Sequence, residues 1–161
     1  NEIWNYQQSS LGFNYRLNDL QAALGLNQIK RLKIFIKERH KIADLYDKFF
    51  RENENIITPF QYEKSFSSYH LYIIKVSNNN GYERNKIFER LRGQGYQVNI
   101  HYIPIYKHPF FSKNFKKQNF PFSEDYYSKA ISLPIFPFLK EKDVKNIVNI
   151  INNKINFQHI F

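Results

Sequence analysis

The stretch NDLQAALGLNQIKRLKIFIKERHKIADLYDKFFREN, residues 18–53, carries the clearest structural signal in this sequence. Its apolar side chains recur at helical spacing from Leu20 to Phe49, and lysines and arginines fall between them. This pattern is typical of a helix with one apolar face and a charged outer face. We therefore predict one long helix, or two helices end to end, over 18–53.

The beginning of this helix has its own signature. Asn18 is a favourable N-cap residue, Asp19 lies in the first turn, and Gln21 stands at the reach-back position of a capping box. Gly25 lies inside the pattern, where glycine costs about 1 kcal/mol relative to alanine. We interpret it as a close packing contact or a bend. Residues 1–17 lack a clear period, and we expect them to form a loop.

Shorter elements follow towards the C-terminus. The patterns predict strands at 69–76 and 96–102, helices at 83–93, 123–130 and 140–154, and an edge strand or extended segment at 131–137. The stretch 103–122 is irregular and aromatic. This order favours the α+β class, with a small, mainly antiparallel sheet covered by helices. We predict a single domain over 1–161, in which 66–156 form a small α+β part.

The composition excludes several classes of protein. Hydrophobic residues make up 42% of the 161, enough to offset chain entropy, so the chain is not disordered. The absence of cysteine excludes disulfides and thiolate metal sites. No apolar stretch approaches the length of a membrane span, and no signal-peptide pattern opens the chain. We expect a cytoplasmic protein that does not bind membranes.

The formal charge of +10, together with 18% aromatic residues, raises the alternative of a nucleic-acid-binding domain. Lysines and arginines are spread along the whole chain, which favours an ordinary solvated surface. A basic rim that attracts an anionic substrate such as a nucleotide sugar is a further interpretation. We expect no nucleic-acid partner, and binding that persists at physiological salt would argue otherwise.

Spacing alone assigns no catalytic apparatus. The sequence has no Gly-rich phosphate loop, no Gly-x-Ser-x-Gly elbow and no His-Glu-x-x-His motif. Its five histidines lie far apart, and an isolated histidine is more often a structural residue than a ligand.

Several stretches, taken in order, form a recognisable set. LGFNYRLNDLQAALG at 11–25 is followed by HLY at 70–72, HYIPIY at 101–106, SEDYY at 123–127 and ISLP at 131–134. This set resembles the DegT/DnrJ/StrS family of fold-type I, PLP-dependent sugar aminotransferases, and it covers nearly the whole chain. Within the family, NYRLN and HYIPIY are most similar to the pseudaminic-acid pathway branch. That branch moves an amino group from glutamate to C4 of a UDP-linked 4-keto-6-deoxy-N-acetylhexosamine.

The resemblance implies that this chain is the C-terminal part of a homodimeric enzyme of surface-glycan or flagellin sugar biosynthesis. In the family the larger N-terminal domain binds most of the PLP and supplies the Schiff-base lysine. No lysine here sits in a matching motif, so we expect the chain to be inactive alone. A non-catalytic dimerisation fragment remains an alternative.

By the same resemblance, Asn14 lies on a loop that reaches the other subunit and hydrogen-bonds its PLP phosphate. An amide suits this role because it donates a hydrogen bond without adding a charge. The alternative is that Asn14 only forms a turn. Arg16 is a candidate for binding substrate phosphate, or for pairing with a structural carboxylate.

The resemblance also places His101 near the sugar, with Tyr102 and Tyr106 as further substrate-binding candidates. Strand alternation would put His101 and Tyr102 on opposite faces, so that one of them faces the ligand. The alternative for His101 is a hydrogen-bonded core histidine. We interpret the aromatic residues of 109–127 as core and dimer contacts rather than as a platform that stacks bases.

Overall fold

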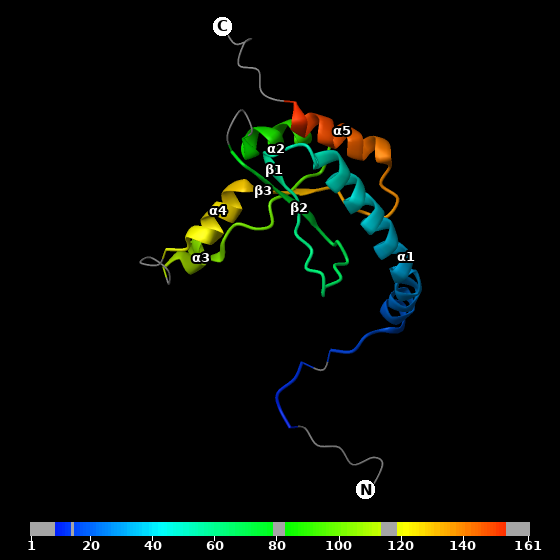
Figure 1. The fold of residues 1–161 in the computed structure, drawn as a ribbon. Helices are drawn as coiled ribbons and strands as arrows, with labels where there is room; N and C mark the ends of the chain where they lie inside the picture. The colour runs from blue at the N-terminus through cyan, green and yellow to red at the C-terminus, as the bar shows by residue number, and fades with distance from the viewer. Residues whose placement is uncertain (1–8, 14, 79–82, 114–118, 154–161) are drawn as a thin grey trace, which may run out of the picture. The chain divides into compact units, whose positions relative to one another are not determined.

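The computed structural model describes residues 9–13, 15–78, 83–113 and 119–153. The chain divides into two compact units, Asn1–Lys33 and Ile34–Phe161, which we describe separately. The long helix α1 (Asp19–Phe50) begins in the first unit and ends in the second (Figure 1). The long helix predicted over 18–53 is thus confirmed as a single element.

In the first unit, α1 begins with the predicted capping box. The backbone N–H of Gln21 donates to Oδ1 of Asn18 at 2.9 Å, and the backbone N–H of Asn18 donates to Oε1 of Gln21 at 3.2 Å. Two otherwise unpaired donors of the first turn are thereby satisfied. The close contact proposed for Gly25 is not found in the described chain, since a Cβ built there meets nothing within 4 Å.

The second unit is built on a three-stranded antiparallel sheet of β1 (Ile56–Ile57), β2 (Tyr72–Val76) and β3 (Ala130–Leu133), in that order. Alternate residues of β2 are buried, so one face of the strand supplies the core. Ile74 stands opposite Ile131 in the register between β2 and β3. The predicted α+β class with an antiparallel sheet is confirmed.

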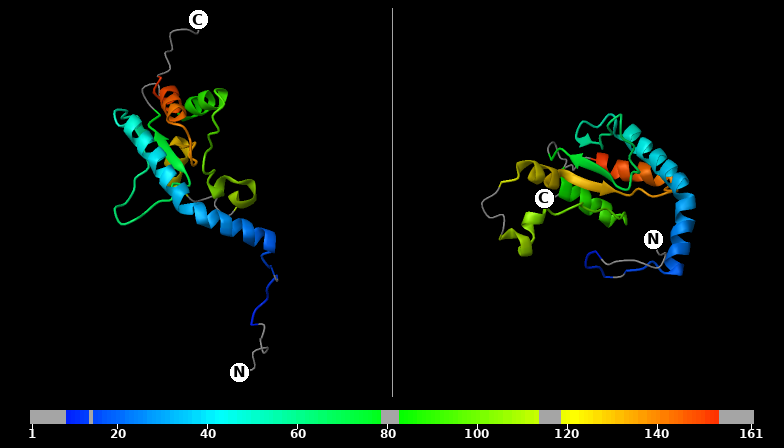
Figure 2. Two further views of the ribbon diagram at one scale, coloured as in Figure 1. Left: turned by 90° about the vertical axis from the view of Figure 1, so that its right-hand side faces the viewer. Right: turned by 90° about the horizontal axis from the view of Figure 1, so that it is seen from below.

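The helices α1, α2 (Arg84–Gly93) and α5 (Glu141–Asn152) contribute buried residues to the core beside this sheet. The chain also contains α3 (Pro109–Ser112) and α4 (Pro121–Lys129), with a 3₁₀ turn, η1, at Ile105–Lys107. α2 and α5 lie side by side, and the further views agree (Figures 1 and 2). The end of α1 lies against α5, where Nζ of Lys145 lies 5.7 Å from the ring centroid of Phe49, and just beyond α1 the Nδ2 of Asn53 donates to Oδ1 of Asn152 at 2.6 Å.

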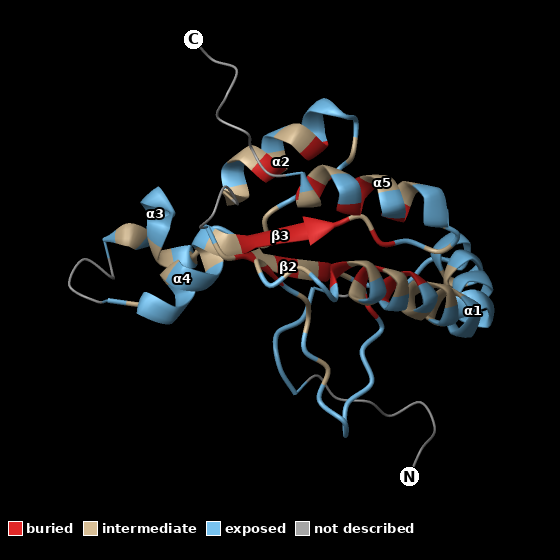
Figure 3. Cartoon of the chain, turned by 45° about the horizontal axis from the view of Figure 1, so that its top comes forward, coloured by how far each residue is buried: buried red, intermediate tan, exposed pale blue. Residues whose placement is uncertain are grey.

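The core lies between the sheet and these helices, where the buried parts of α2, α5 and β3 face one another (Figure 3). The ring of Tyr46 on α1 stacks on that of Tyr72, with centroids 4.8 Å apart, and its hydroxyl donates to the carbonyl oxygen of Pro134 at 3.0 Å. Burial raises the pKa of both tyrosines. The other fully buried large side chains are Ile74, Ile87, Leu91, Ile131, Ile147, Ile151, Val76 and Val144.

The strand predicted at 96–102 is wrong. In this segment Asn99 alone pairs with the sheet, through an isolated bridge to Ser132. The backbone N–H of Val98 donates to the carbonyl of Tyr96 at 3.1 Å, and that of Ile100 donates to the side chain of Asn99 at 2.8 Å. Donors that a strand would use along a ladder are therefore used in local turns.

Other boundaries differ for identifiable reasons. β2 begins three residues later than predicted, because Tyr69 has a φ of 45° and cannot be extended. α4 begins earlier than predicted, with Pro121 at its first position. β3 is an edge strand as predicted, but it ends before Pro134. The pattern did not predict the two-residue β1. None of the helices in the described ranges is both long and apolar enough to cross a membrane.

Candidate functional site

His101 is positioned by the edge strand of the sheet. Its Nδ1 lies 2.6 Å from Oγ of Ser132 on β3, and Ser132 is only 4% exposed. The bridge between Asn99 and Ser132 holds the backbone just before His101 at the same point. Because the bond to Ser132 engages Nδ1, Nε2 is the ring nitrogen that can reach a ligand. The imidazole itself is only partly buried.

Tyr102 lies against His101. Their ring centroids are 4.5 Å apart with the rings nearly perpendicular, and Tyr102 is exposed. The expectation that the two side chains face opposite sides is therefore wrong. The physical reason is that alternation holds only in a strand, and residues 96–102 do not form one.

Tyr106 lies in η1 and faces α4 and the residues before it. Its ring stacks on Phe120 with centroids 4.5 Å apart, and its hydroxyl is buried. Desolvation, followed by the neighbouring Glu124 carboxylate, raises the pKa of Tyr106. Nζ of Lys107 lies 2.5 Å from Oε2 of Glu124, and this contact lowers the pKa of Glu124. The structure thus gives Tyr106 a role in fastening η1 to α4.

An open pocket of about 330 Å³ lies beside Tyr102 in the second unit. Its size is at the lower end of the range for small-molecule sites. The described residues that line it carry aromatic rings or small neutral groups and no charge. They are Tyr102, Pro104, Phe122, Ser123, Tyr126 and Tyr127.

This pocket changes the interpretation of the aromatic residues of 109–127. Phe122 is 91% exposed and Phe110 is 83% exposed, and neither Phe111 nor Tyr126 is buried. The part of the interpretation that makes these side chains core contacts is wrong for these four, and the part that makes them dimer contacts stays a prediction. α3 and α4 are short helices that carry no buried residue, so their aromatic side chains have no core to enter.

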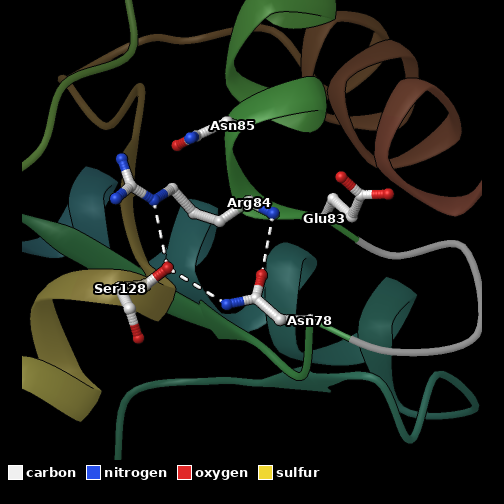
Figure 4. A pocket seen from close by; sticks show the side chains of 5 residues that line it. All are labelled: Asn78, Glu83, Arg84, Asn85 and Ser128. Atoms are coloured by element: carbon white, nitrogen blue, oxygen red, sulfur yellow. Dashed lines mark hydrogen bonds between the residues drawn. The ribbon is translucent and has the colours of Figure 1, made fainter.

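Arg84, at the start of α2, holds the end of α4. Its Nε and the Nδ2 of Asn78 each donate to the carbonyl of Ser128 at 3.2 Å, while the backbone N–H of Arg84 donates to Oδ1 of Asn78 (Figure 4). Another guanidinium nitrogen donates to the carbonyl of Tyr127. A cavity of about 440 Å³ opens beside this network, with Glu83 and Asn85 also lining it. The network satisfies helix-terminal carbonyls and fixes Tyr127.

The other two candidates belong to the first unit. Asn14 lies outside the described residues. Arg16 lies before α1, outside any helix or strand, and is exposed. His101, Tyr102 and Tyr106 are the predicted site residues found in the second unit.

Ser132 is the residue that sequence reasoning missed. It appeared only as part of ISLP, although a serine between Ile131 and Leu133 in a wholly buried strand is a signal in itself. A buried hydroxyl requires a hydrogen-bond partner, and here His101 provides it. Within the described ranges, no group of three or more His, Asp or Glu side chains could hold a metal ion.

The geometry combines a histidine with a fixed ring, neutral hydroxyls and an aromatic pocket, which suits a sugar-containing ligand. The DegT/DnrJ/EryC1/StrS aminotransferase family model matches residues 1–152. The chain belongs to this family. The resemblance drawn from the sequence motifs is thereby confirmed.

Individual relatives agree with this membership. UDP-4-amino-4,6-dideoxy-N-acetyl-beta-L-altrosamine transaminase of Helicobacter pylori is 34% identical over 87% of this chain and 37% of its own. The structure of Helicobacter pylori PseC, an aminotransferase involved in pseudoaminic acid biosynthesis, matches with a TM-score of 0.80 and 31% identity over 94% of this chain and 41% of its own. The PLP-form structure of Spr1654, a putative sugar aminotransferase of Streptococcus pneumoniae, matches with a TM-score of 0.77 and 29% identity over 91% of this chain and 38% of its own. The chain thus spans about two fifths of the length of these family members.

Proposed function

We propose that this chain is the C-terminal part of a PLP-dependent aminotransferase that acts on a nucleotide sugar. The amino group would pass from glutamate to C4 of a UDP-linked 4-keto-6-deoxy-N-acetylhexosamine, for surface-glycan or flagellin sugar biosynthesis. The observation that carries this proposal is His101, held by the buried Ser132 beside an open aromatic pocket, in a chain of the sugar aminotransferase family. The UDP transaminase among the relatives supports the substrate class.

In this proposal His101 orients the sugar. Because Nδ1 is hydrogen-bonded to Ser132, Nε2 is left to form a hydrogen bond with a sugar hydroxyl. The hydroxyl of the neighbouring Tyr102 can form a second hydrogen bond to the sugar. Holding the sugar in one orientation favours reaction at a single carbon. Tyr106 acts less directly, because its ring stacks on Phe120 and its hydroxyl is buried.

Bound PLP supplies the electron sink that allows an amino group to be exchanged. The neutral groups around His101 fit a sugar rather than the cofactor's phosphate, which requires cations or several N–H donors. We therefore assign the cofactor to residues outside the second unit. Asn14 is our candidate for the PLP phosphate of the partner subunit in a homodimer, and Arg16 is our candidate for a substrate phosphate. The lysine that holds PLP would come from the rest of the enzyme.

The apolar residues of the first unit support the idea that more polypeptide is needed. Leu20 and Leu24 lie one turn apart on α1 and are both exposed, and Ile29 on the same helix is exposed as well. Exposed apolar surface of this kind marks an interaction site. Since the chain spans about two fifths of its relatives, we propose that the part of the enzyme corresponding to the remainder covers these residues.

The proposal is tested with an exchange protein, in which this chain replaces the matching segment of the Helicobacter pylori transaminase. With PLP and ¹⁵N-glutamate, the exchange protein is expected to place ¹⁵N on the UDP-linked 4-keto sugar, detected by mass spectrometry. The 161-residue chain alone should transfer none. A folded, PLP-loaded exchange protein that forms no amino sugar would contradict the proposal and favour the dimerisation fragment.

A further inference from the structure

We infer that the pocket beside Tyr102 binds the planar base of the nucleotide sugar by stacking. This inference rests on the proposed function, because it takes the substrate to be a nucleotide sugar. It adds a subsite formed by α4 and the segment after His101, and it assigns Phe122 and Tyr126 a role in binding. It also reverses the expectation that the aromatic residues of 109–127 do not stack bases.

The chemistry of the lining selects the kind of ligand. The six described residues that line the pocket carry no charge, so a carboxylate or phosphate would find no ion-pair partner among them. Aromatic faces attract a planar heterocycle, and the hydroxyls of Tyr102, Ser123 and Tyr126 can bond its polar edge. Burial raises the pKa of Tyr126, so its hydroxyl keeps the proton that it would donate. Glutamate, a flexible dicarboxylate, fits this lining poorly.

The ring of Phe122 offers an accessible face at the pocket. Phe122 is 91% exposed although it is a large apolar side chain beside a concave surface. A base that stacked on Phe122 would remove apolar surface from water on both partners. Phe110 on α3 is nearly as exposed, at 83%, but it does not line the pocket. Exposure alone therefore does not define the site, and Phe110 provides a matched control.

One wall of the pocket is held rigidly. The ring of Tyr127 lies 5.5 Å from the guanidinium carbon of Arg84 and 5.1 Å from Nζ of Lys107. Arg84 also donates hydrogen bonds to the backbone carbonyls of Tyr127 and Ser128 on α4. Lys107, in η1, forms an ion pair with Glu124, which also lies on α4. A preorganised wall lowers the entropy lost on binding.

Tyr102 belongs both to the pocket and to the proposed sugar site. Tyr102 lines the pocket and also contacts the ring of His101 at 4.5 Å. A ligand with a sugar at one end and a base at the other could therefore contact His101 and Phe122 together. Within this arrangement Tyr102 separates the two subsites.

The test uses the complete 161-residue chain and three probes: UDP, 5,6-dihydro-UDP, whose base is not aromatic, and inorganic pyrophosphate. Saturation-transfer NMR is expected to show the uracil protons of UDP in closest contact with the protein. UDP should bind more tightly than dihydro-UDP. F122A should weaken UDP binding roughly tenfold, as expected when a base loses one stacking partner. Pyrophosphate binding should not change, and F110A should behave as the unsubstituted chain. Near-UV circular dichroism checks that each variant keeps its tertiary structure.

Equal binding of UDP and dihydro-UDP, or an unchanged UDP affinity in folded F122A, would overturn the inference and leave only attraction of anions to a basic chain. These measurements require neither PLP nor amino transfer, so the inference and the proposed function fail separately. If the exchange protein is active but F122A leaves its KM for the UDP-sugar unchanged, only the inference about the base is contradicted. If the chain binds UDP through Phe122 but the exchange protein is inactive, only the proposed function is contradicted.

Discussion

I74A is expected to destabilise the second unit by about 2–5 kcal/mol, the usual cost of truncating a fully buried isoleucine. Ile74 lies on the central strand β2, is fully buried, and stands opposite Ile131. Since small domains are stable by about 5–15 kcal/mol, this loss is a large share of the total. The urea midpoint of the chain, followed by circular dichroism, measures it.

The matched control is I57A on β1. Ile57 is also a strand isoleucine, but it is 53% exposed, so its truncation should shift the midpoint far less. Similar midpoints for the two variants would mean that the core is not organised around β2 as described.

In the exchange protein, H101A is expected to lower kcat/KM for the UDP-sugar by roughly tenfold to hundredfold. This range corresponds to losing about 1–3 kcal/mol when a hydrogen bond is removed and its partner group is left unsatisfied. S132A should lower kcat/KM in the same direction by less, because the imidazole remains but is no longer held at Nδ1. Steady-state kinetics at saturating glutamate measure both effects.

H108A is the control for this pair. His108 precedes α3, is exposed, and belongs to no lining of the aromatic pocket. If H101A and H108A gave equal kcat/KM values in folded protein, His101 would have no role in the site, and the structural-histidine alternative would stand.

Local signals predicted the long helix well, because they act within the helix itself. The capping box formed by Asn18 and Gln21 involves residues only three positions apart, and both of its hydrogen bonds are present. The α+β class followed from the order of helices and strands. These features depend little on contacts between distant parts of the chain.

Features set by distant contacts were predicted less well. The 96–102 segment has an alternating pattern, but turns at Val98 and Ile100 use its donors, and a single bridge to Ser132 remains. The pairing of His101 with Ser132 joins residues 31 apart, and no spacing rule connects them. Composition could not show that Phe122 would be exposed, because aromatic side chains are usually buried and the exposure arises from two short helices without a core.

The most direct test of the central claim, that this chain is one part of a PLP-dependent aminotransferase, is the visible absorption spectrum of the exchange protein after incubation with PLP and gel filtration. We expect a yellow protein that retains bound cofactor, with weaker retention in N14A because the phosphate contact is lost. A folded exchange protein that elutes colourless, while the parent transaminase treated in the same way is yellow, would contradict it.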